Sequence, residues 1–182
     1  MTTFSLLAAL FACGRPPEPA VVPMALPITT PAVAPPTPAQ PLPVTPSAPD
    51  GYVEVSVGDV TESGGGAAVE LVEPQSHRVV TMMIGGTEGH SILLRKHGSA
   101  PPRPLTHDLF DAALHELHAE VLQVQVDTLE AGVFHGTVVL VQDERVIPLD
   151  ARPSDAIALA LGAKAPIYMA RAVLDRAGED RN

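Results

Sequence analysis

The chain has 182 residues, a formal net charge of −10 at pH 7, no tryptophan and an aromatic content of 3%. An acidic chain does not attract nucleic-acid phosphates through its net field, and so few aromatic side chains argue against a binder that stacks bases on aromatic platforms. Any contact with nucleic acid must therefore be local, at particular arginines, or be bridged by metal cations.

The first residues of the chain form an apolar run that ends at a cysteine. An apolar run, FSLLAALFA over 4–12, is too short to span a bilayer and precedes Cys13, the only cysteine. The sequence LFAC over 10–13 resembles the lipobox, which implies a signal peptide over 1–12 and a lipid anchor on Cys13. No aspartate follows the cysteine, so we expect the periplasmic side of the outer membrane in the cell envelope. The alternative is a cytoplasmic chain with a chance cysteine.

Proline divides the rest of the chain. More than half of the 20 prolines lie between Arg15 and Asp50, and proline at that density blocks helices and central strands. We therefore expect residues 13–50 to be a lipidated, disordered tether that favours extended polyproline II conformations. The remaining part, about 130 residues, is long enough for one independent core. It divides into a folded domain over 51–178 and a polar tail over 179–182.

The first half of the folded part predicts three strands and a helix. Apolar and polar residues alternate over 52–60, which indicates a half-buried strand, and further strands are expected over 67–72 and 78–84. Short turns between these strands indicate an antiparallel meander. A helix is expected over 87–97, with Thr87 as its N-cap and Gly98 as its stop.

The second half predicts two buried or amphipathic helices among further strands. Thr106 is expected to cap a helix whose apolar residues recur at helical spacing, and Pro153 to open a helix that is apolar on nearly every side. The apolar residues of the first of these helices are Leu109, Phe110, Ala113, Leu114 and Leu117. Strands are expected over 120–129, 133–141, 145–149 and 165–170, and a last helix over 171–177. The predicted class is α+β, a single compact domain of mixed or antiparallel sheet with three to four helices.

Two polar signatures open two of the predicted helices. They are RPLTHD over 103–108 and DARPSDAI over 150–157. A helix N-terminus binds anions, and an arginine beside it pairs bidentately with carboxylate or phosphate. One interpretation is structural: Arg103 or Arg152 pairs with Asp108 or Asp155 in a buried clasp, and the hydroxyls of Thr106 and Ser154 cap the helices.

The other interpretation is catalytic and uses the same residues. Carboxylates that converge on Mg²⁺ or Mn²⁺ can activate water for phosphodiester hydrolysis, a histidine can move the proton, and an arginine can stabilise the charged transition state. The candidate catalytic residues are His107, Asp108, Asp155, Arg103 and Arg152; the substrate-binding residues are Thr106 and Ser154; and the metal ligands are Glu88, Asp108, Asp150 and Asp155.

These motifs, with PIY over 166–168 and the acidic Glu88, resemble the bifunctional nuclease family over about 53–178. In this chain Glu88 is followed by Gly89 and His90, where the family usually has Glu-Ala before Ala-Ile. The resemblance implies a compact α+β domain that acts on DNA and RNA, but it carries over no particular catalytic residue.

We therefore expect a divalent-metal nuclease-like domain with nucleic acid as substrate, tethered by lipid to an envelope membrane, and we also consider a homo-oligomer. One alternative is a non-enzymatic binding or scaffold domain whose arginine and aspartate motifs are structural. A third interpretation is a sensor of small anions or nucleotides at the two helix starts.

Overall fold

A computed structural model describes residues 44–181 of the chain. The expected signal peptide, Cys13 and most of the proline-rich segment lie outside these described residues. Within the described part, no helix has the length and apolar character needed to cross a membrane. Residues 44–50 have no strand or helix, and the backbone N–H of Ser47 donates to Oε1 of Gln123 at 3.1 Å. The end of the expected tether thus contacts the sheet.

The observed elements follow the predicted order. In chain order they are β1 (Tyr52–Ser63), β2 (Gly66–Val72), β3 (Arg78–Gly85), α1 (Gly86–Lys96), α2 (Thr106–Glu116), β4 (Ala119–Glu130), β5 (Val133–Gln142), β6 (Arg145–Ala151), α3 (Pro153–Ala163), β7 (Ile167–Ala170), α4 (Arg171–Ala177) and β8 (Glu179–Asp180). The predicted α+β class is confirmed. Glu179 and Asp180, expected only as a polar tail, pair with β3.

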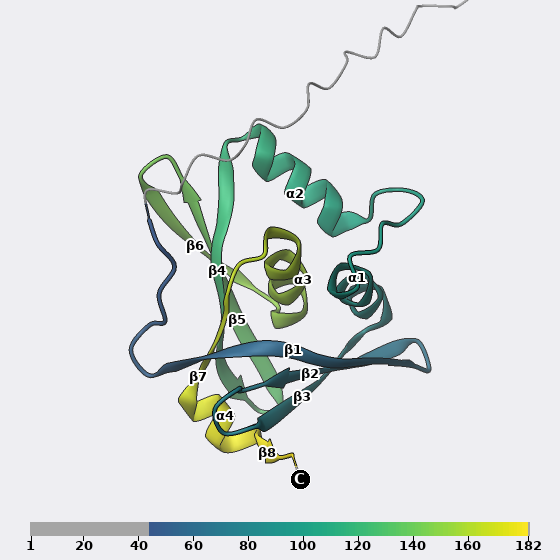
Figure 1. Cartoon of the computed structure of the whole chain (residues 1–182), viewed down its shortest axis with the longest axis vertical. Helices are drawn as coiled ribbons and strands as arrows, with labels where there is room; N and C mark the ends of the chain where they lie inside the picture. The colour runs from purple at the N-terminus through teal and green to yellow at the C-terminus, as the bar shows by residue number, and fades with distance from the viewer. Residues whose placement is uncertain (1–43, 182) are drawn as a thin grey trace, which may run out of the picture. The chain divides into compact units, whose positions relative to one another are not determined.

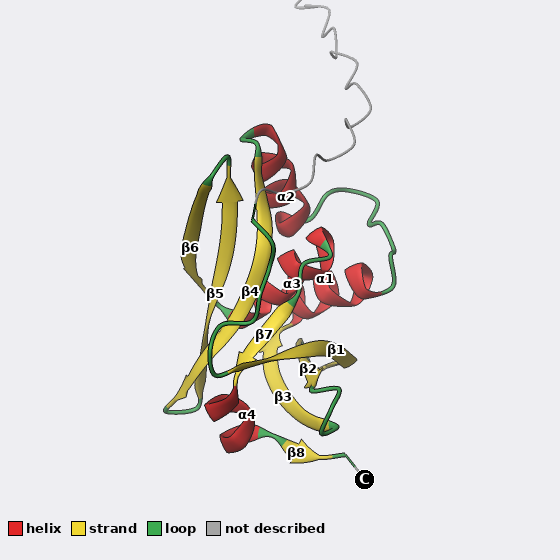
Figure 2. Cartoon of the chain, turned by 60° about the vertical axis from the view of Figure 1, so that its left-hand side comes forward, coloured by secondary structure: helices red, strands yellow, loops and turns green. Residues whose placement is uncertain are grey.

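The strands form one mixed sheet in the order β6-β5-β4-β7-β1-β2-β3-β8. The β4–β7 pair is parallel and the other pairs are antiparallel. In Figure 2 the helices α1, α2 and α3 lie on the same side of β4, β5 and β6. Strands β1, β2 and β3 cross below these helices in Figure 1. The short strand β7 therefore joins two groups of strands that come from different parts of the chain.

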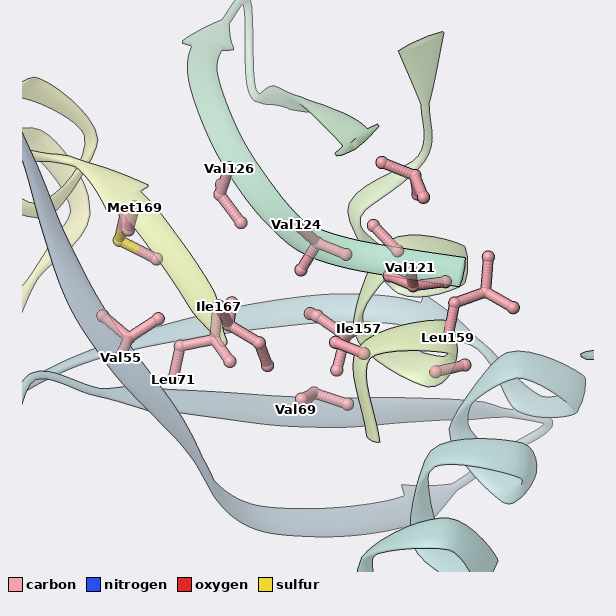
Figure 3. Close-up of a cluster of buried hydrophobic side chains, with 14 of the residues drawn as sticks. Val55, Val69, Leu71, Val121, Val124, Val126, Ile157, Leu159, Ile167 and Met169 are labelled. Atoms are coloured by element: carbon pink, nitrogen blue, oxygen red, sulfur yellow. The ribbon is translucent and has the colours of Figure 1, made fainter. Parts of the chain in front are cut away.

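The core lies around α3, as its apolar sequence predicts. Helix α3 packs against α1, α2, β4 and β5, and Ile157 and its neighbours Ala156 and Ala158 are completely buried. Figure 3 shows Ile157 among valine and leucine side chains that come from both groups of strands. Burying a side chain of this size stabilises the fold by about 1.5–3 kcal/mol. One continuous core thus fixes the position at which α3 begins.

Helix α1 approaches the sheet closely at a glycine. A Cβ atom on Gly89 would lie 2.2 Å from the Cβ atom of Ala67 in β2, far inside van der Waals contact. Only a residue without a side chain therefore allows α1 to lie this close to β2. This contact sets the height of the α1 N-terminus above the sheet.

The burial of α2 differs from what its apolar spacing suggests. Of the five apolar residues that recur along this helix only Leu114 is buried, whereas Leu109 is 68% exposed and Leu117 is 62% exposed. Helix α2 instead turns His107 and two aspartates toward the rest of the domain. Its apolar side faces outward from the described part of the chain.

The helix starts also differ from the prediction. The N-cap of α1 is Gly85 rather than Thr87, and the N-cap of α2 is Leu105 rather than Thr106. Neither residue offers a capping side chain, but Oδ2 of Asp108 accepts a hydrogen bond from the Leu105 N–H at 2.8 Å. This contact is the carboxylate half of a capping box, and it satisfies the backbone in place of a hydroxyl. The stop of α1 is as predicted, because Gly98 has a φ of 62° just beyond the helix.

Both tyrosines of the chain are partly or fully buried where β1 pairs with β7. The Tyr52 hydroxyl donates to Oδ1 of Asp127 at 2.8 Å. Burial raises the pKa of Tyr52 from 10.0 to about 12, with help from the hydrogen bond and the charge of Asp127. Burial also raises the pKa of Tyr168, and the charge of Glu54 adds to this effect. In both cases the folded state favours the neutral phenol.

With two tyrosines and no tryptophan in the chain, tyrosinate absorbance gives a clean titration. We expect Tyr52 to ionise near pH 12, and its share of the stability to be complete below pH 10.0 and lost as the pH rises toward about 12. Asp127→Asn is expected to lower this midpoint, whereas the exposed control Asp143→Asn leaves it unchanged. A wild-type titration in which both tyrosines ionise near pH 10.0 contradicts the burial described here.

Candidate functional site

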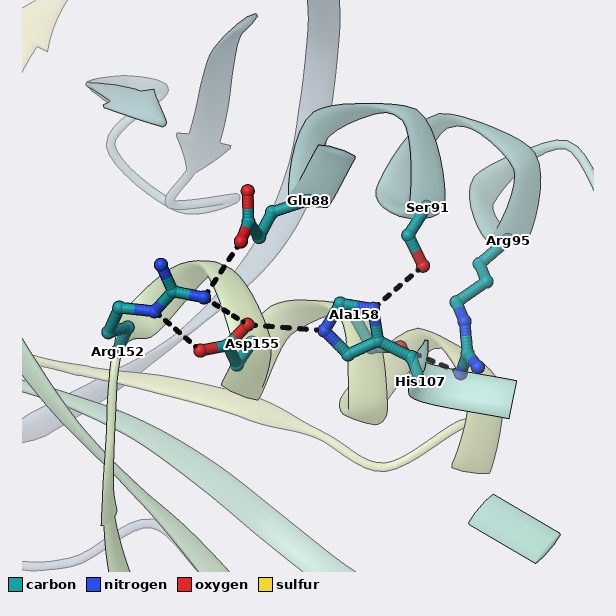
Figure 4. A network of polar contacts seen from close by, with 7 residues as sticks. All are labelled: Glu88, Ser91, Arg95, His107, Arg152, Asp155 and Ala158. Carbon is teal, nitrogen blue, oxygen red and sulfur yellow. Dashed lines mark hydrogen bonds and ion pairs between the residues drawn. The ribbon is translucent and has the colours of Figure 1, made fainter. Parts of the chain in front are cut away.

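The N-termini of α1 and α3 meet at one arginine. Arg152, just before α3, donates from Nε to Oδ2 of Asp155 at 2.7 Å and from Nη2 to Oδ1 at 3.0 Å. The same Nη2 donates to Oε1 of Glu88, in the first turn of α1, at 2.8 Å. Figure 4 shows the guanidinium group between the two carboxylates. The arginine and aspartate of the second motif are therefore a pair, as the structural interpretation predicts, and Glu88 joins them.

The charges of these groups stabilise one another. Hydrogen bonds to its own backbone N–H and to Arg152 lower the pKa of Glu88. The carboxylates of Asp155 and Glu88 raise the pKa of Arg152 above its ordinary value. A Cβ atom on Gly85 would lie 2.3 Å from Oε2 of Glu88, so a glycine at this position leaves room for the carboxylate. The pair is not buried, because the Arg152 side chain is 66% exposed.

His107 extends the cluster into the interior. Its Nε2 lies 3.2 Å from Oδ1 of Asp155, and its Nδ1 lies 3.0 Å from the hydroxyl of Ser91. An ionised carboxylate only accepts hydrogen bonds, so Nε2 donates to Asp155, while Nδ1 and the Ser91 hydroxyl form the second hydrogen bond of the ring. We call Glu88, Ser91, His107, Arg152 and Asp155 the Arg152 cluster. It links α1, α2 and α3 through side chains (Figure 4).

A second cluster lies deeper between the same three helices. Arg95 of α1 contacts Oδ1 of Asp108 and Oδ2 of Asp111, both at 2.7 Å, and its Nη1 donates to the carbonyl oxygen of Ala158 at 3.1 Å. The Arg95 side chain is 9% exposed. Burial raises the pKa of Asp111 even though Arg95 opposes this shift. We call Arg95, Asp108 and Asp111 the Arg95 cluster.

This second cluster needs a glycine in α3. A Cβ atom on Gly162 would lie 1.9 Å from Nη1 of Arg95. The guanidinium therefore lies against the α3 backbone, at a place that a larger residue would occupy. Its Nε atom is buried without a hydrogen-bond partner, so the ion pairs and the carbonyl contact hold the group in place.

The structure separates the residues that the sequence grouped together. His107, Asp155 and Arg152 meet, but Asp108 belongs to the Arg95 cluster and Asp150 is exposed on β6. Arg103 is exposed before α2 and takes part in neither cluster.

The hydroxyls of Thr106 and Ser154, which are expected to bind substrate, lie in the first turns of α2 and α3, but neither residue is a helix N-cap. Thr106 is exposed as the first residue of α2, and Ser154 is buried within the first turn of α3. The α3 N-cap is Arg152, and no side chain caps that helix, so capping by Ser154 is wrong.

The expected metal ligands do not converge. Both oxygens of Asp108 and both oxygens of Asp155 are engaged by arginine, histidine or backbone donors, and the Arg152 guanidinium lies between Asp155 and Glu88. Over residues 44–181, no group of three or more His, Cys, Asp or Glu side chains is arranged to hold a metal ion. This arrangement does not fit a Mg²⁺ or Mn²⁺ ion shared by Asp108 and Asp155, because such an ion is held through carboxylate oxygens and those of both residues are engaged by other groups.

Sequence reasoning missed Arg95, Ser91 and Asp111. None of them lies in either helix-start motif, and their partners are remote in the chain. The available signal is in α2, where Asp108 and Asp111 are three residues apart and therefore lie on one helix face. Two acidic residues on the same helix face as the buried His107 indicate that a cationic side chain from another element pairs with them.

The part of the chain that contains both clusters matches a known protein family. Residues 69–182 match the family model described as the bifunctional nuclease domain. The chain belongs to the bifunctional nuclease domain family. Every residue of the Arg152 cluster and of the Arg95 cluster lies within the matched part, so the family name covers the whole candidate site.

Two mycobacterial relatives resemble the domain. They are "Uncharacterized protein MT1877" of Mycobacterium tuberculosis strain CDC 1551 / Oshkosh and "Uncharacterized protein Rv1829" of strain ATCC 25618 / H37Rv. Each is 38% identical over 108 residues, which cover 59% of this chain and 64% of the relative. The match thus spans somewhat less than two thirds of each relative, and their names state no activity. The family membership makes a nuclease-like function the leading hypothesis for this domain.

Proposed function

We propose that this domain is a nuclease-like phosphodiester hydrolase and that Arg152 contacts the phosphate of its nucleic-acid substrate. Membership of the bifunctional nuclease domain family carries this proposal. Within the matched residues, Arg152 is the cluster member whose side chain is most open to a ligand, at 66% exposure. Its Nη1 has no hydrogen-bond partner within the described part of the chain, so this edge of the guanidinium is available to a phosphate oxygen.

The other members of the Arg152 cluster would hold the guanidinium group of Arg152 in position. Asp155 and Glu88 hold the guanidinium plane from two sides, and His107 and Ser91 hold Asp155 from the interior. Hydrolysis adds water across the P–O bond, and charge develops on the phosphate oxygens in the transition state. A donor that is already fixed in place stabilises this charge without reorganisation. In this arrangement His107 is a positioning residue, because both of its ring nitrogens are engaged within the fold.

Dependence on Mg²⁺ or Mn²⁺ stays a prediction. The carboxylates that the sequence nominates are engaged by donors and do not fit a shared ion in this arrangement, so we derive no step through a metal. An activity assay with Mg²⁺, with Mn²⁺ and with EDTA tests this requirement independently of the role of Arg152.

The decisive experiment measures cleavage of fluorescent single-stranded and double-stranded DNA and RNA by the full chain. Arg152→Gln is expected to reduce the cleavage rate by about 100-fold or more, because it removes the donor to the transition-state charge. Arg152→Lys is expected to restore little activity, since an ammonium group cannot replace the planar fork. His107→Gln and Asp155→Asn are expected to give intermediate losses through the position of Arg152.

The matched control is Arg145→Gln. Arg145 is an exposed arginine at the opposite end of β6 from Ala151, and its replacement changes the net charge by the same amount. We expect it to retain activity within about twofold, as is usual for surface substitutions away from a site. Equal cleavage rates for Arg152→Gln and wild type, with both proteins folded, would contradict the role of Arg152.

A second candidate function is a non-enzymatic binding or scaffold domain. The observation that favours it is that every carboxylate of the two clusters is already paired with an arginine. In the Arg152 cluster two carboxylates face one guanidinium, and this local charge opposes phosphate binding. Absence of cleavage of all four substrates under every metal condition, together with a large loss of thermal stability in Asp155→Ala, would favour this function over hydrolysis.

We further propose that Cys13 anchors the chain to an envelope membrane by a lipid. The support is the sequence around Cys13, which lies outside the described residues. In a bacterial host that processes lipoproteins, we expect the wild type to incorporate labelled fatty acid and to sediment with membranes. Cys13→Ser is expected to lose both properties, while Ser47→Ala, a similar change in the same segment, keeps them. Equal membrane recovery of Cys13→Ser and wild type would contradict the anchor.

A further inference from the structure

Helix α2 exposes four apolar residues and turns His107, Asp108 and Asp111 toward the domain. Leu109 is 68% exposed, Phe110 is 40% exposed and Leu117 is 62% exposed, and Ala113 between them is also exposed. We call these four residues the α2 apolar face. They recur at spacings of three and four residues, so they form one stripe along the helix. No other element of the described part of the chain covers this stripe.

The opposite side of α2 has fixed internal partners. His107 is held by Ser91 and Asp155, and the aspartates Asp108 and Asp111 are held by Arg95. The helix therefore cannot rotate to bury the α2 apolar face without breaking both clusters. Burial of this face requires a surface from outside the described domain, since contiguous exposed apolar residues mark interaction sites.

We propose that the α2 apolar face binds the same face of a second copy of this chain, with the two α2 helices antiparallel about Ala113. In this arrangement Leu109 of one copy contacts Leu117 of the second copy, and each Phe110 packs beside the contact. A two-fold interface must be self-complementary, and a stripe with leucines at equal distances on either side of its centre meets this requirement. The small side chain of Ala113 at the centre allows the helices to approach closely.

The charges at the ends of α2 favour the antiparallel arrangement. Arg103 lies before the helix, and the acidic Glu116 and Glu120 lie at and beyond its end; all three are exposed. The positive end of the helix dipole adds to Arg103, and the negative end adds to the acids. An antiparallel second copy places each positive end beside a negative end, whereas a parallel copy places like charges together.

The same charges argue against other occupants. An interfacial membrane helix is rich in lysine and arginine along its polar side, but α2 (THDLFDAALHE) contains neither residue. A nucleic acid requires cations rather than an apolar stripe. A second copy of the chain is therefore the occupant whose chemistry matches this face.

Disulfide cross-linking tests the geometry directly. The chain has one cysteine, so the full chain with Cys13→Ser and Ala113→Cys carries one thiol at the centre of the proposed interface. We expect this thiol to form a disulfide-linked dimer at least about tenfold faster than a control with Cys13→Ser and Val133→Cys, because proximity raises the effective concentration. Val133 is 57% exposed in another part of the domain, at the start of β5. Equal rates for the two thiols would overturn the proposal.

Sedimentation of the full chain tests the energetics. We expect a dimer whose dissociation constant rises by at least about 100-fold in Leu109→Glu, since the two-fold axis buries the new charge twice. Val133→Glu, with the same change at an exposed site, is expected to leave the dimer intact. A monomeric wild type, or association that Leu109→Glu does not weaken, overturns the proposal. Monomers that bind phospholipid vesicles through α2, and lose this binding in Leu109→Glu, would overturn it in favour of a membrane.

Discussion

Arg95→Met is expected to lower the free energy of unfolding by about 3–5 kcal/mol, the range for breaking a buried ion pair by removing one partner. Methionine keeps most of the length and the apolar stem of the arginine but none of its donors. Asp108 and Asp111 then lose the guanidinium that pairs with both of them, and the Ala158 carbonyl loses one donor. Chemical denaturation monitored by circular dichroism measures the loss.

The pH dependence of this loss identifies its cause. Burial already raises the pKa of Asp111, and removal of Arg95 raises this pKa further. A raised carboxyl pKa contributes stability at low pH that is lost as the pH rises through the folded-state value. The deficit of Arg95→Met should therefore be smaller near pH 4 than at pH 7. Arg145→Met, at an exposed arginine, controls for the loss of one positive charge. A deficit below about 1 kcal/mol, or one that does not depend on pH, would contradict a buried ionic cluster.

Gly89→Ala is expected to destabilise the domain by about 2 kcal/mol, although alanine is the better helix former by about 1 kcal/mol. The added Cβ would lie 2.2 Å from the Cβ of Ala67, so α1 and β2 must separate. Overpacking of a well-packed core typically costs about 1–3 kcal/mol. The shift also moves Glu88 and Ser91, so we expect loss of stability together with a disturbed Arg152 cluster.

A compensating substitution tests whether the loss comes from this contact. Ala67→Gly removes the opposing methyl group and by itself is expected to cost about 1 kcal/mol, as glycine does within a strand. Combined with Gly89→Ala it should cost less than the two separate losses together, with a coupling energy of about 1 kcal/mol or more. Strictly additive losses would place the origin of the destabilisation elsewhere.

The element order of the fold could be predicted because the local patterns are strong. Alternating apolar residues mark β1 and β4, apolar runs between turn residues mark β2, β3, β5 and β6, and the uniformly apolar α3 is buried as expected. The strand order could not be predicted in the same way. The insertion of β7 between β4 and β1 depends on pairing between segments remote in the chain, and its four residues IYMA carry no signal for their neighbours.

The orientation of helix α2 could not be predicted from the spacing of its apolar residues. The recurrence of Leu109 and Leu117 indicates an amphipathic helix, but it does not say which side faces the domain. The answer depends on Arg95, which lies in another helix and selects the side that carries Asp108 and Asp111. A single buried arginine thus outweighs the apolar pattern, because an unpaired buried charge costs more than exposed leucines.

In the candidate site, contacts within one helix start could be predicted from the sequence, whereas contacts between helices could not. Arg152 and Asp155 are three residues apart at the start of one helix, so the sequence motif alone can reveal their contact. The contacts of Glu88 with Arg152 and of His107 with Asp155 join separate helices, so only their chemistry could be foreseen. The metal site expected from Glu88, Asp108, Asp150 and Asp155 assumed that acids near helix starts converge, whereas three of them have basic partners or backbone donors instead.

The position of β7 has a consequence for folding. The pairing of this strand joins β1, from the beginning of the domain, to β4. Before β7 pairs, the other strands form two separate groups with unpaired edges at β1 and β4. Closure of the sheet therefore awaits this long-range pairing, which is intrinsically slow. Until then, both edges are open to pairing with other polypeptides.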